Sequence, residues 1–384
     1  MYDTKSLKTQ TYFSFVDGLK GIACIMIMIS HYIGIVKYSQ DITYFPAIIW
    51  LNKSIFATII DEGFWLQLFF VISGFLLSYS RVCNIKDLIK RVAKRFLRFY
   101  LPILSACFLI YILSKSIGFH NGDTTALFSC PWYQSFYSRN ITIVDLIKDP
   151  IKTVLVGGSE FNAPYWVIKD MFLSSVLIYF INFVIEKLGE KRVLNIFIYL
   201  FVILAGGFLI SPIISACLSG ALCGVLLKNL KNYIEKIPET INHILCLLCI
   251  VFPFGLHNVI YYLVKKCLDI ANIAVEIMKY LEFRDTSWGV FYFTLLVLLL
   301  SGNKGIQEIL SCKVLCKFNK ISFGIYSFHW PLICSIGALL ILVRPSKLGM
   351  IMGWIVCIII TFGVSIFYHI VFENNINKIM KKIL

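Results

Sequence analysis

The sequence predicts an all-α integral membrane protein, a polytopic helix bundle with about ten transmembrane segments. Of its 384 residues, 59% are hydrophobic and only 15% are charged, and the mean hydropathy is +0.81. Soluble domains are roughly 25% charged, so this composition excludes a soluble globular enzyme and a disordered chain. A spanning helix needs about 20 apolar residues. The length therefore fits about ten spans in one membrane domain, residues 1–384, with no large additional soluble domain.

Ten apolar runs mark the expected spans. The first carries charged residues and has no small-residue cleavage site, so we interpret it as a span and not as a cleaved signal peptide. The sixth is short and rich in Gly, Ala and Cys, which predicts close helix packing. The runs cover residues 16–36, 64–80, 96–114, 164–185, 193–210, 212–227, 241–264, 288–301, 322–343 and 349–372.

The distribution of basic residues predicts the orientation. With the N-terminus in the cytoplasm, the inner segments hold 22 Lys and Arg and the outer loops hold 12. Cytoplasmic loops carry an excess of Lys and Arg, so we expect both termini in the cytoplasm and the protein in the cell (inner) membrane. The amphipathic stretch 269–283 is expected to lie on the outer membrane surface.

The thirteen cysteines lie mostly inside apolar runs, so we interpret them, including Cys246 and Cys249, as small packing residues. Zinc sites combine Cys and His at characteristic spacings. No such cluster occurs in the sequence, and no metal is expected. Cys130 and Cys267 fall in predicted outer loops, and a disulfide between them stays open.

The first predicted span holds three ionisable residues: Asp17, Lys20 and His31. Such residues inside a membrane are costly and are candidates for function. Asp17 and Lys20 are three residues apart and share a helix face. His31 lies eleven residues beyond Lys20, on the same face and about 16 Å deeper at 1.5 Å per residue. A polar stripe of this kind needs a partner helix or a water-filled cavity.

Seven basic residues fall within the 18 residues from Arg81 to Arg98. One interpretation is a membrane anchor that binds anionic lipid. The other is a cytoplasmic phosphate site, in which Arg95 and Arg98, one turn apart, bind phosphate oxygens in a bidentate way. The neighbouring Arg91 and Lys94 would add to such a site.

Two further polar groups lie near predicted spans. Tyr326 and His329 share one face of a span that Pro331 is expected to kink. Lys169 and Asp170 follow Trp166 at the outer end of the fourth span. By itself, the pair of Tyr326 and His329 is more typical of packing than of chemistry. The pair of Lys169 and Asp170 is more typical of a structural ion pair.

Taken together, the motifs resemble the membrane-bound acyltransferase family three, the O-acyltransferases of bacterial surface polysaccharides. The match rests on five segments in the family's order, which are D-G-L-K-G-I-A with His31 (17–31), F-F-V-I-S-G-F-L (69–76), K-R-F-L-R with Pro102 (94–102), I-Y-S-F-H-W-P (325–331) and F-E-N-N (372–375).

Two positions depart from the family pattern. Lys20 stands where the family has an arginine, so it keeps the charge and loses the guanidinium fork. Met171 stands where the family has a glutamate five residues after a tryptophan, here Trp166, and Asp170 lies one position early. The chain is expected to be a stand-alone form without the fused esterase-like domain of some members.

The resemblance implies acyl transfer from a cytoplasmic acyl-CoA, most often acetyl-CoA, to a glycan hydroxyl at the outer face. His31 would act as general base or transient acyl carrier. Asp17 and Lys20 complete the candidate catalytic set, and Lys20 would hold the donor near the mouth of the first span. Arg95, Arg98, Arg91 and Lys94 would bind the donor. Tyr326, His329, Trp166 and Asp170 are second candidates for binding substrate, and Glu373 is expected to be structural.

Alternatives stay open from the sequence. The same architecture with succinyl-CoA as donor is one. A transporter or flippase for a glycan or lipid-linked glycan is another, although transporters commonly show two similar halves and none are visible. The sequence leaves open the acceptor glycan and the oligomeric state. Direct transfer and an acyl-enzyme intermediate also both stay open.

Overall fold

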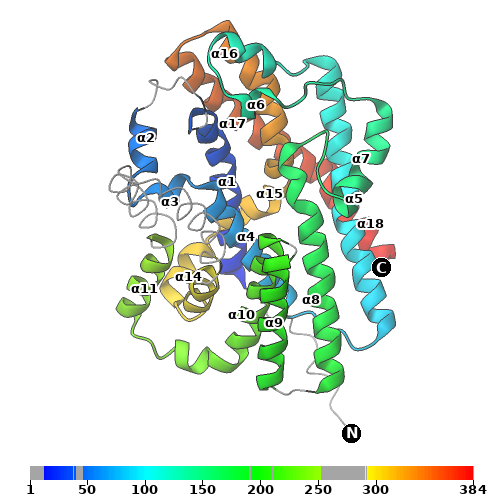
Figure 1. Cartoon of the computed structure of the whole chain (residues 1–384), viewed down its shortest axis with the longest axis vertical. Coiled ribbons are helices and arrows are strands. Elements are labelled where there is room, and N and C mark those ends of the chain that lie inside the picture. Colours follow the sequence, from blue (N-terminus) through cyan, green and yellow to red (C-terminus); the bar gives the residue numbers. More distant parts are fainter. Residues whose placement is uncertain are drawn as a thin grey trace, which may run out of the picture.

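The computed structural model describes residues 13–37, 39, 46–189, 192–209, 211–251, 290 and 292–383. Within these ranges all regular secondary structure is helical, and the helices form one elongated bundle (Figure 1). Cys267 and the amphipathic stretch 269–283 lie outside the described residues, so the disulfide and the surface helix stay predictions.

Six helical segments are long and apolar enough to cross a membrane, and a bent pair, Tyr292–Leu300 with Lys304–Leu310, adds a seventh. Three shorter apolar helices accompany them. In its described residues, each of the ten apolar runs overlaps one of these helices, which confirms an all-α, multi-pass membrane protein. The count of ten and the orientation stay predictions. The main helices are α1 (Ser14–Lys37), α4 (Glu62–Leu77), α5 (Ile85–Ser116), α8 (Ile168–Leu188), α9 (Arg192–Leu209), α10 (Pro212–Ile234), α11 (Glu239–Val251), α15 (Lys313–Leu332) and α17 (Lys347–Tyr368).

Shorter elements join and cap these helices. A π-helical turn, η5 (Ile333–Gly337), follows Pro331 and continues α15 into α16 (Ala338–Val343). The other short elements are α2 (Pro46–Asn52), α3 (Ala57–Ile60), η2 (Gly122–Ala126), α6 (Pro131–Gln134), α7 (Ile143–Leu155), η3 (Ala163–Val167), α14 (Lys304–Leu310), η6 (His369–Glu373) and α18 (Asn374–Ile383).

Helix α1 lies in the interior of the bundle, against α15 and α4 (Figure 1). Its apolar residues are largely buried, whereas α5 and α17 expose large apolar side chains such as Phe108 and Ile359. Exposed apolar side chains on outer helices are expected where a bundle meets hydrocarbon. The polar stripe of α1 is therefore enclosed by protein.

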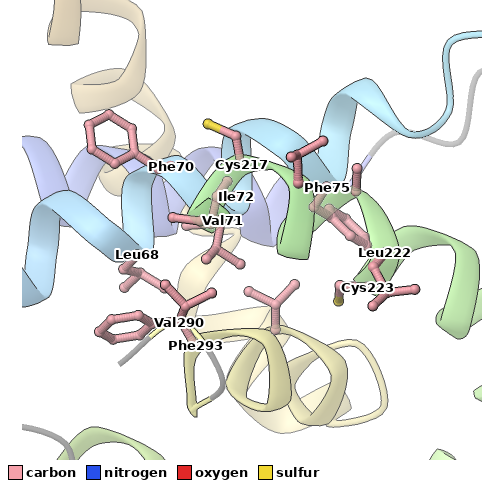
Figure 2. Packing of buried hydrophobic residues seen from close by; sticks show 14 of the residues in the cluster. Leu68, Phe70, Val71, Ile72, Phe75, Cys217, Leu222, Cys223, Val290 and Phe293 are labelled. Atoms are coloured by element: carbon pink, nitrogen blue, oxygen red, sulfur yellow. The ribbon is translucent and has the colours of Figure 1, made fainter. Parts of the chain in front are cut away.

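Helices α4 and α10 pack backbone to backbone, as the small residues of the sixth run predict. A Cβ atom added at Gly74 would lie 1.7 Å from the Cys217 carbonyl oxygen, and one at Gly220 would lie 1.8 Å from the Val71 carbonyl oxygen. Figure 2 shows Val71, Phe75 and Cys217 interleaved at this contact. Nine of the twelve free cysteines described are buried, which confirms their packing role.

Replacing Gly220 by alanine is expected to destabilise the protein by about 1–3 kcal/mol, because the backbone of α4 leaves no room for a methyl group. Thermal unfolding of the detergent-purified variant measures this. Gly363→Ala is the matched control, since a Cβ atom there meets nothing within 4 Å. Equal unfolding temperatures for the two variants would contradict the close approach of α4 and α10.

Candidate active site

Two histidines from helices far apart in the sequence meet inside the bundle. Nε2 of His329 on α15 lies 3.3 Å from Nδ1 of His31 on α1. His329 is buried, with 1% of its surface exposed. His31 is enclosed by aromatic rings, since Trp132 stacks 6.4 Å from it and Trp330 meets it edge-on at 5.5 Å.

The hydrogen bonds of this pair indicate where the ring protons sit. Nδ1 of His31 lies 2.8 Å from the Ile27 carbonyl oxygen, and Nδ1 of His329 lies 2.8 Å from the Ile325 carbonyl oxygen. A carbonyl oxygen only accepts, so Nδ1 carries the proton in each ring. In the neutral rings, the Nδ1 proton of His31 is then shared between the Ile27 carbonyl oxygen and Nε2 of His329, and Nε2 of His31 keeps a free lone pair.

His31 lines a cavity of about 430 Å³ between α1, α4 and the segment before α8. Two tryptophans, Trp132 and Trp166, line its wall together with the polar side chains of Glu62 and Gln67. Oε1 of Gln67 is buried and has no hydrogen-bond partner among the described residues. We call this space the outer cavity, because it opens at the end of the bundle that the sequence predicts to be outside.

A second, apolar cavity of about 130 Å³ adjoins the first, and His329 lines it. We call it the inner cavity. The two cavities share five lining residues, so they are adjacent. Because His31 lines the outer cavity and His329 lines the inner one, the two histidines meet at the junction of the cavities. The shared residues are Ile27, Leu66, Phe70, Val167 and Tyr326.

Cations border the far end of the inner cavity. The Lys20 ammonium lies 5.4 Å from the centre of the Phe69 ring, and the Arg95 guanidinium lies 4.6 Å from that of Phe99. Both rings line the inner cavity. Arg95 donates a hydrogen bond to Ser175 Oγ at 2.9 Å. Lys20 lies close enough to Arg95 and Arg98 to interact electrostatically with both, so like charges converge here from α1 and α5.

The remaining basic residues of α5 do not join this cluster. Arg91 forms an ion pair with Asp87 at 3.2 Å, and Asp87 itself lies in the first turn of the helix that Asn84 caps. The backbone at Lys94 places its side chain on the exposed face. Of the four α5 residues that the sequence offers for donor binding, Arg95 and Arg98 lie near Lys20, whereas Arg91 and Lys94 lie outside that group.

Three of the predicted polar residues hold neighbouring elements in place. Asp17 accepts a hydrogen bond from Asn319 of α15 at 2.8 Å. The Tyr326 hydroxyl donates to the Pro164 carbonyl oxygen while its ring lines both cavities. Asp170 forms the expected ion pair with Lys169 at 3.5 Å and accepts from Ser211 Oγ at 2.7 Å.

Ser211 lines the outer cavity, so Asp170, which binds Ser211, lies just behind the wall of that cavity. The next residue, Met171, lines the inner cavity. Glu373 pairs with His369 at 2.9 Å, at the end of the bundle away from the outer cavity, as a structural residue would.

Sequence reasoning missed three residues of the outer cavity: Glu62, Gln67 and Trp132. Glu62 is close enough to His31 to interact with it electrostatically. A carboxylate and an amide at the start of a predicted span were a usable signal for the first two, since polar groups inside a membrane mark function. Trp132 comes from a long loop, whose packing no periodicity predicts.

The fold and site define a class: a multi-pass helical membrane protein with a histidine pair between an aromatic, polar cavity and a cation-bordered one. A family model described as an acyltransferase domain, acyltransferase family 3, matches residues 13–370. The chain therefore belongs to this family, and it is a membrane acyltransferase. No curated protein and no solved structure matches the chain. Family membership favours acyl transfer over the transport alternative.

Proposed function

We propose that the protein moves an acyl group, most often acetyl, from acyl-CoA to a hydroxyl group of a surface or secreted glycan. The observation that carries the proposal is the His31–His329 contact at the junction of two cavities of different chemistry. A donor that enters past the cations and an acceptor that enters past the tryptophans would meet at His31. We expect this transfer to take place in the cell (inner) membrane, with the donor on its cytoplasmic side.

The inner cavity suits the donor. CoA carries phosphates, which Lys20, Arg95 and Arg98 attract, and guanidinium groups bind phosphate oxygens with charge-assisted hydrogen bonds. The pantetheine arm is narrow and largely apolar, as is the inner cavity lined by Phe69 and Phe99. The thioester would then lie beside the histidine pair, on the far side of the cavity from its phosphates.

The outer cavity suits a sugar hydroxyl. Aromatic rings offer flat apolar faces to the C–H faces of a sugar ring, and Trp132 and Trp166 supply them. A site of this kind orients its ligand with a few polar groups, here Glu62 and Gln67. The unpaired Gln67 Oε1 needs a donor, which a hydroxyl group provides.

His31 would connect the two substrates chemically. Its free Nε2 takes the proton from the acceptor hydroxyl as the oxygen attacks the thioester carbonyl carbon. The C–S bond then breaks, and the proton passes to the departing CoA thiolate. In the alternative route Nε2 itself attacks the thioester, the C–S bond breaks and CoA leaves as the thiolate. The acceptor oxygen then takes the acyl group from Nε2, and the hydroxyl proton passes to the thiolate.

The test is mass spectrometry of envelope glycans from cells with and without the protein. The proposal predicts a sugar that carries an added acyl group only when the protein is present. One acetyl group adds about 42 Da to the mass of the sugar. The mass also separates acetyl from succinyl donors. Identical glycan masses in the two samples would overturn the proposed acceptor class.

Replacing Arg95 by alanine is expected to weaken acyl-CoA binding by at least about tenfold, since a hydrogen bond to a charged group is worth about 1.5–3 kcal/mol. Binding of labelled acetyl-CoA to the detergent-purified protein measures the change. Arg139→Ala is the control, because Arg139 pairs with Asp145 and Glu160 on an exposed loop. Unchanged donor affinity in the Arg95 variant would remove the phosphate site.

A further inference from the structure

A third cavity, separate from the two that meet at His31, lies where α4, α8, α9 and α10 end or begin. It measures about 710 Å³ and is mostly polar. It lies at the end of the bundle that holds the lower ends of α8, α9 and α10 in Figure 1. Its lining includes Tyr79, Arg81, Asn182, Asn195, Lys228 and Asn229.

Two side chains of this cavity are available to a ligand, a buried amide oxygen of Asn195 and the exposed ammonium of Lys228. Oδ1 of Asn195 has no hydrogen-bond partner among the described residues, although Asn195 is only 8% exposed. The Lys228 ammonium lies 5.4 Å from the centre of the Tyr79 ring, and the described part of the chain gives it no ion pair. Arg81, by contrast, pairs with Glu186 at 2.6 Å. The cavity therefore offers one buried acceptor, one available cation and one aromatic face.

Helix α8 leads from the donor's phosphate site into this cavity. Ser175, which holds Arg95, and Asn182, which lines the cavity, are seven residues apart and share one helix face. Tyr179 lies between them on that face and interacts electrostatically with Arg95. At 1.5 Å per residue the distance along α8 is about 10 Å. A diphosphate at Arg95 would thus leave the rest of its nucleotide beside the cavity.

We propose that this cavity binds the adenosine 3′-phosphate end of the CoA donor, and we call it the nucleotide pocket. The inference rests on the proposed function. Lys228 contacts the 3′-phosphate, and Tyr79 offers its ring to the adenine. Oδ1 of Asn195 accepts a hydrogen bond from the adenine amino group, which satisfies the buried acceptor. An adenine base has the donor that this oxygen lacks.

The test compares three ligands, CoA, 3′-dephospho-CoA and pantetheine, on the purified full-length protein. Lys228→Met is expected to weaken CoA binding about tenfold and to leave 3′-dephospho-CoA binding unchanged. Arg95→Ala is expected to weaken both, because both contain the diphosphate. Neither change should affect pantetheine. Lys231→Met is the control, since Lys231 lies one turn further along α10 and pairs with Glu235 at 3.8 Å.

A second variant tests the base. The etheno derivative of CoA lacks the adenine amino donor, so wild-type protein is expected to bind it more weakly than CoA. Asn195→Ala should bind the two equally. Two results would show that the nucleotide pocket is wrong while the acyl-CoA donor stands. In one, Lys228→Met weakens the binding of CoA and of 3′-dephospho-CoA by the same factor. In the other, the Lys228 and Lys231 variants bind CoA with the same affinity. If wild-type protein binds none of the three ligands, the donor and the pocket both fall.

Discussion

Replacement of His31 by alanine is expected to lower the rate of acyl transfer by about 10²–10⁴-fold, which is the range that a positioned general base contributes. The reason is that Nε2 of His31 is the nitrogen left with a free lone pair at the junction of the cavities. Donor binding should stay unchanged, because Lys20 and Arg95 lie at the other end of the inner cavity. Transfer of labelled acetyl groups to the acceptor measures the rate.

The matched control is His120→Ala, which removes a histidine that pairs with Asp123 on a loop that the sequence predicts to be outside. It should keep full activity. Circular dichroism and the unfolding temperature establish that both variants fold. A folded His31→Ala protein with full activity would refute the catalytic role. A rapid-quench experiment on wild-type protein without acceptor separates the two routes, since only the covalent route leaves label on His31.

Replacement of His329 by leucine is expected to lower kcat by about 10–100-fold, the range seen when the partner that orients a metal-binding histidine is removed. His329 lines the inner cavity, but in the proposed mechanism it takes no proton and no acyl group from either substrate. It shares the Nδ1 proton of His31 with the Ile27 carbonyl oxygen, and these two acceptors keep Nε2 of that ring unprotonated. We therefore expect kcat to fall while KM for the donor stays the same.

His329→Gln distinguishes this positioning role from a packing role. The glutamine amide oxygen can accept from His31 Nδ1, whereas leucine cannot. The glutamine variant should therefore regain much of the activity at equal thermal stability. Equal kcat values for the two variants would show that His329 contributes volume alone.

The sequence predicted the helices well because each buried or lipid-facing span carries a long apolar run. It also singled out His31, His329, Lys20 and Arg95, since polar residues inside a membrane are costly wherever they occur. It did not predict that His329 contacts His31. The two residues are 298 positions apart, and only the packing of α15 on α1 brings them together.

Other parts of the site depend on packing that no local pattern encodes. Trp132 reaches the outer cavity from a loop, and Lys228 reaches the nucleotide pocket from the end of α10. Arg91 shows the converse. Its position in the basic run suggested phosphate binding, yet Asp87, four residues earlier on the same helix, pairs with it.

The central claim is that donor and acceptor reach His31 from opposite faces of the membrane. Sealed vesicles that contain the protein in one known orientation test it directly, with labelled acetyl-CoA added to one side and the acceptor glycan to the other. We predict labelled acceptor only when acetyl-CoA is on the face that carries Arg95, with no product in the His31→Ala protein. Product that forms only when both substrates are on the same side would contradict the account.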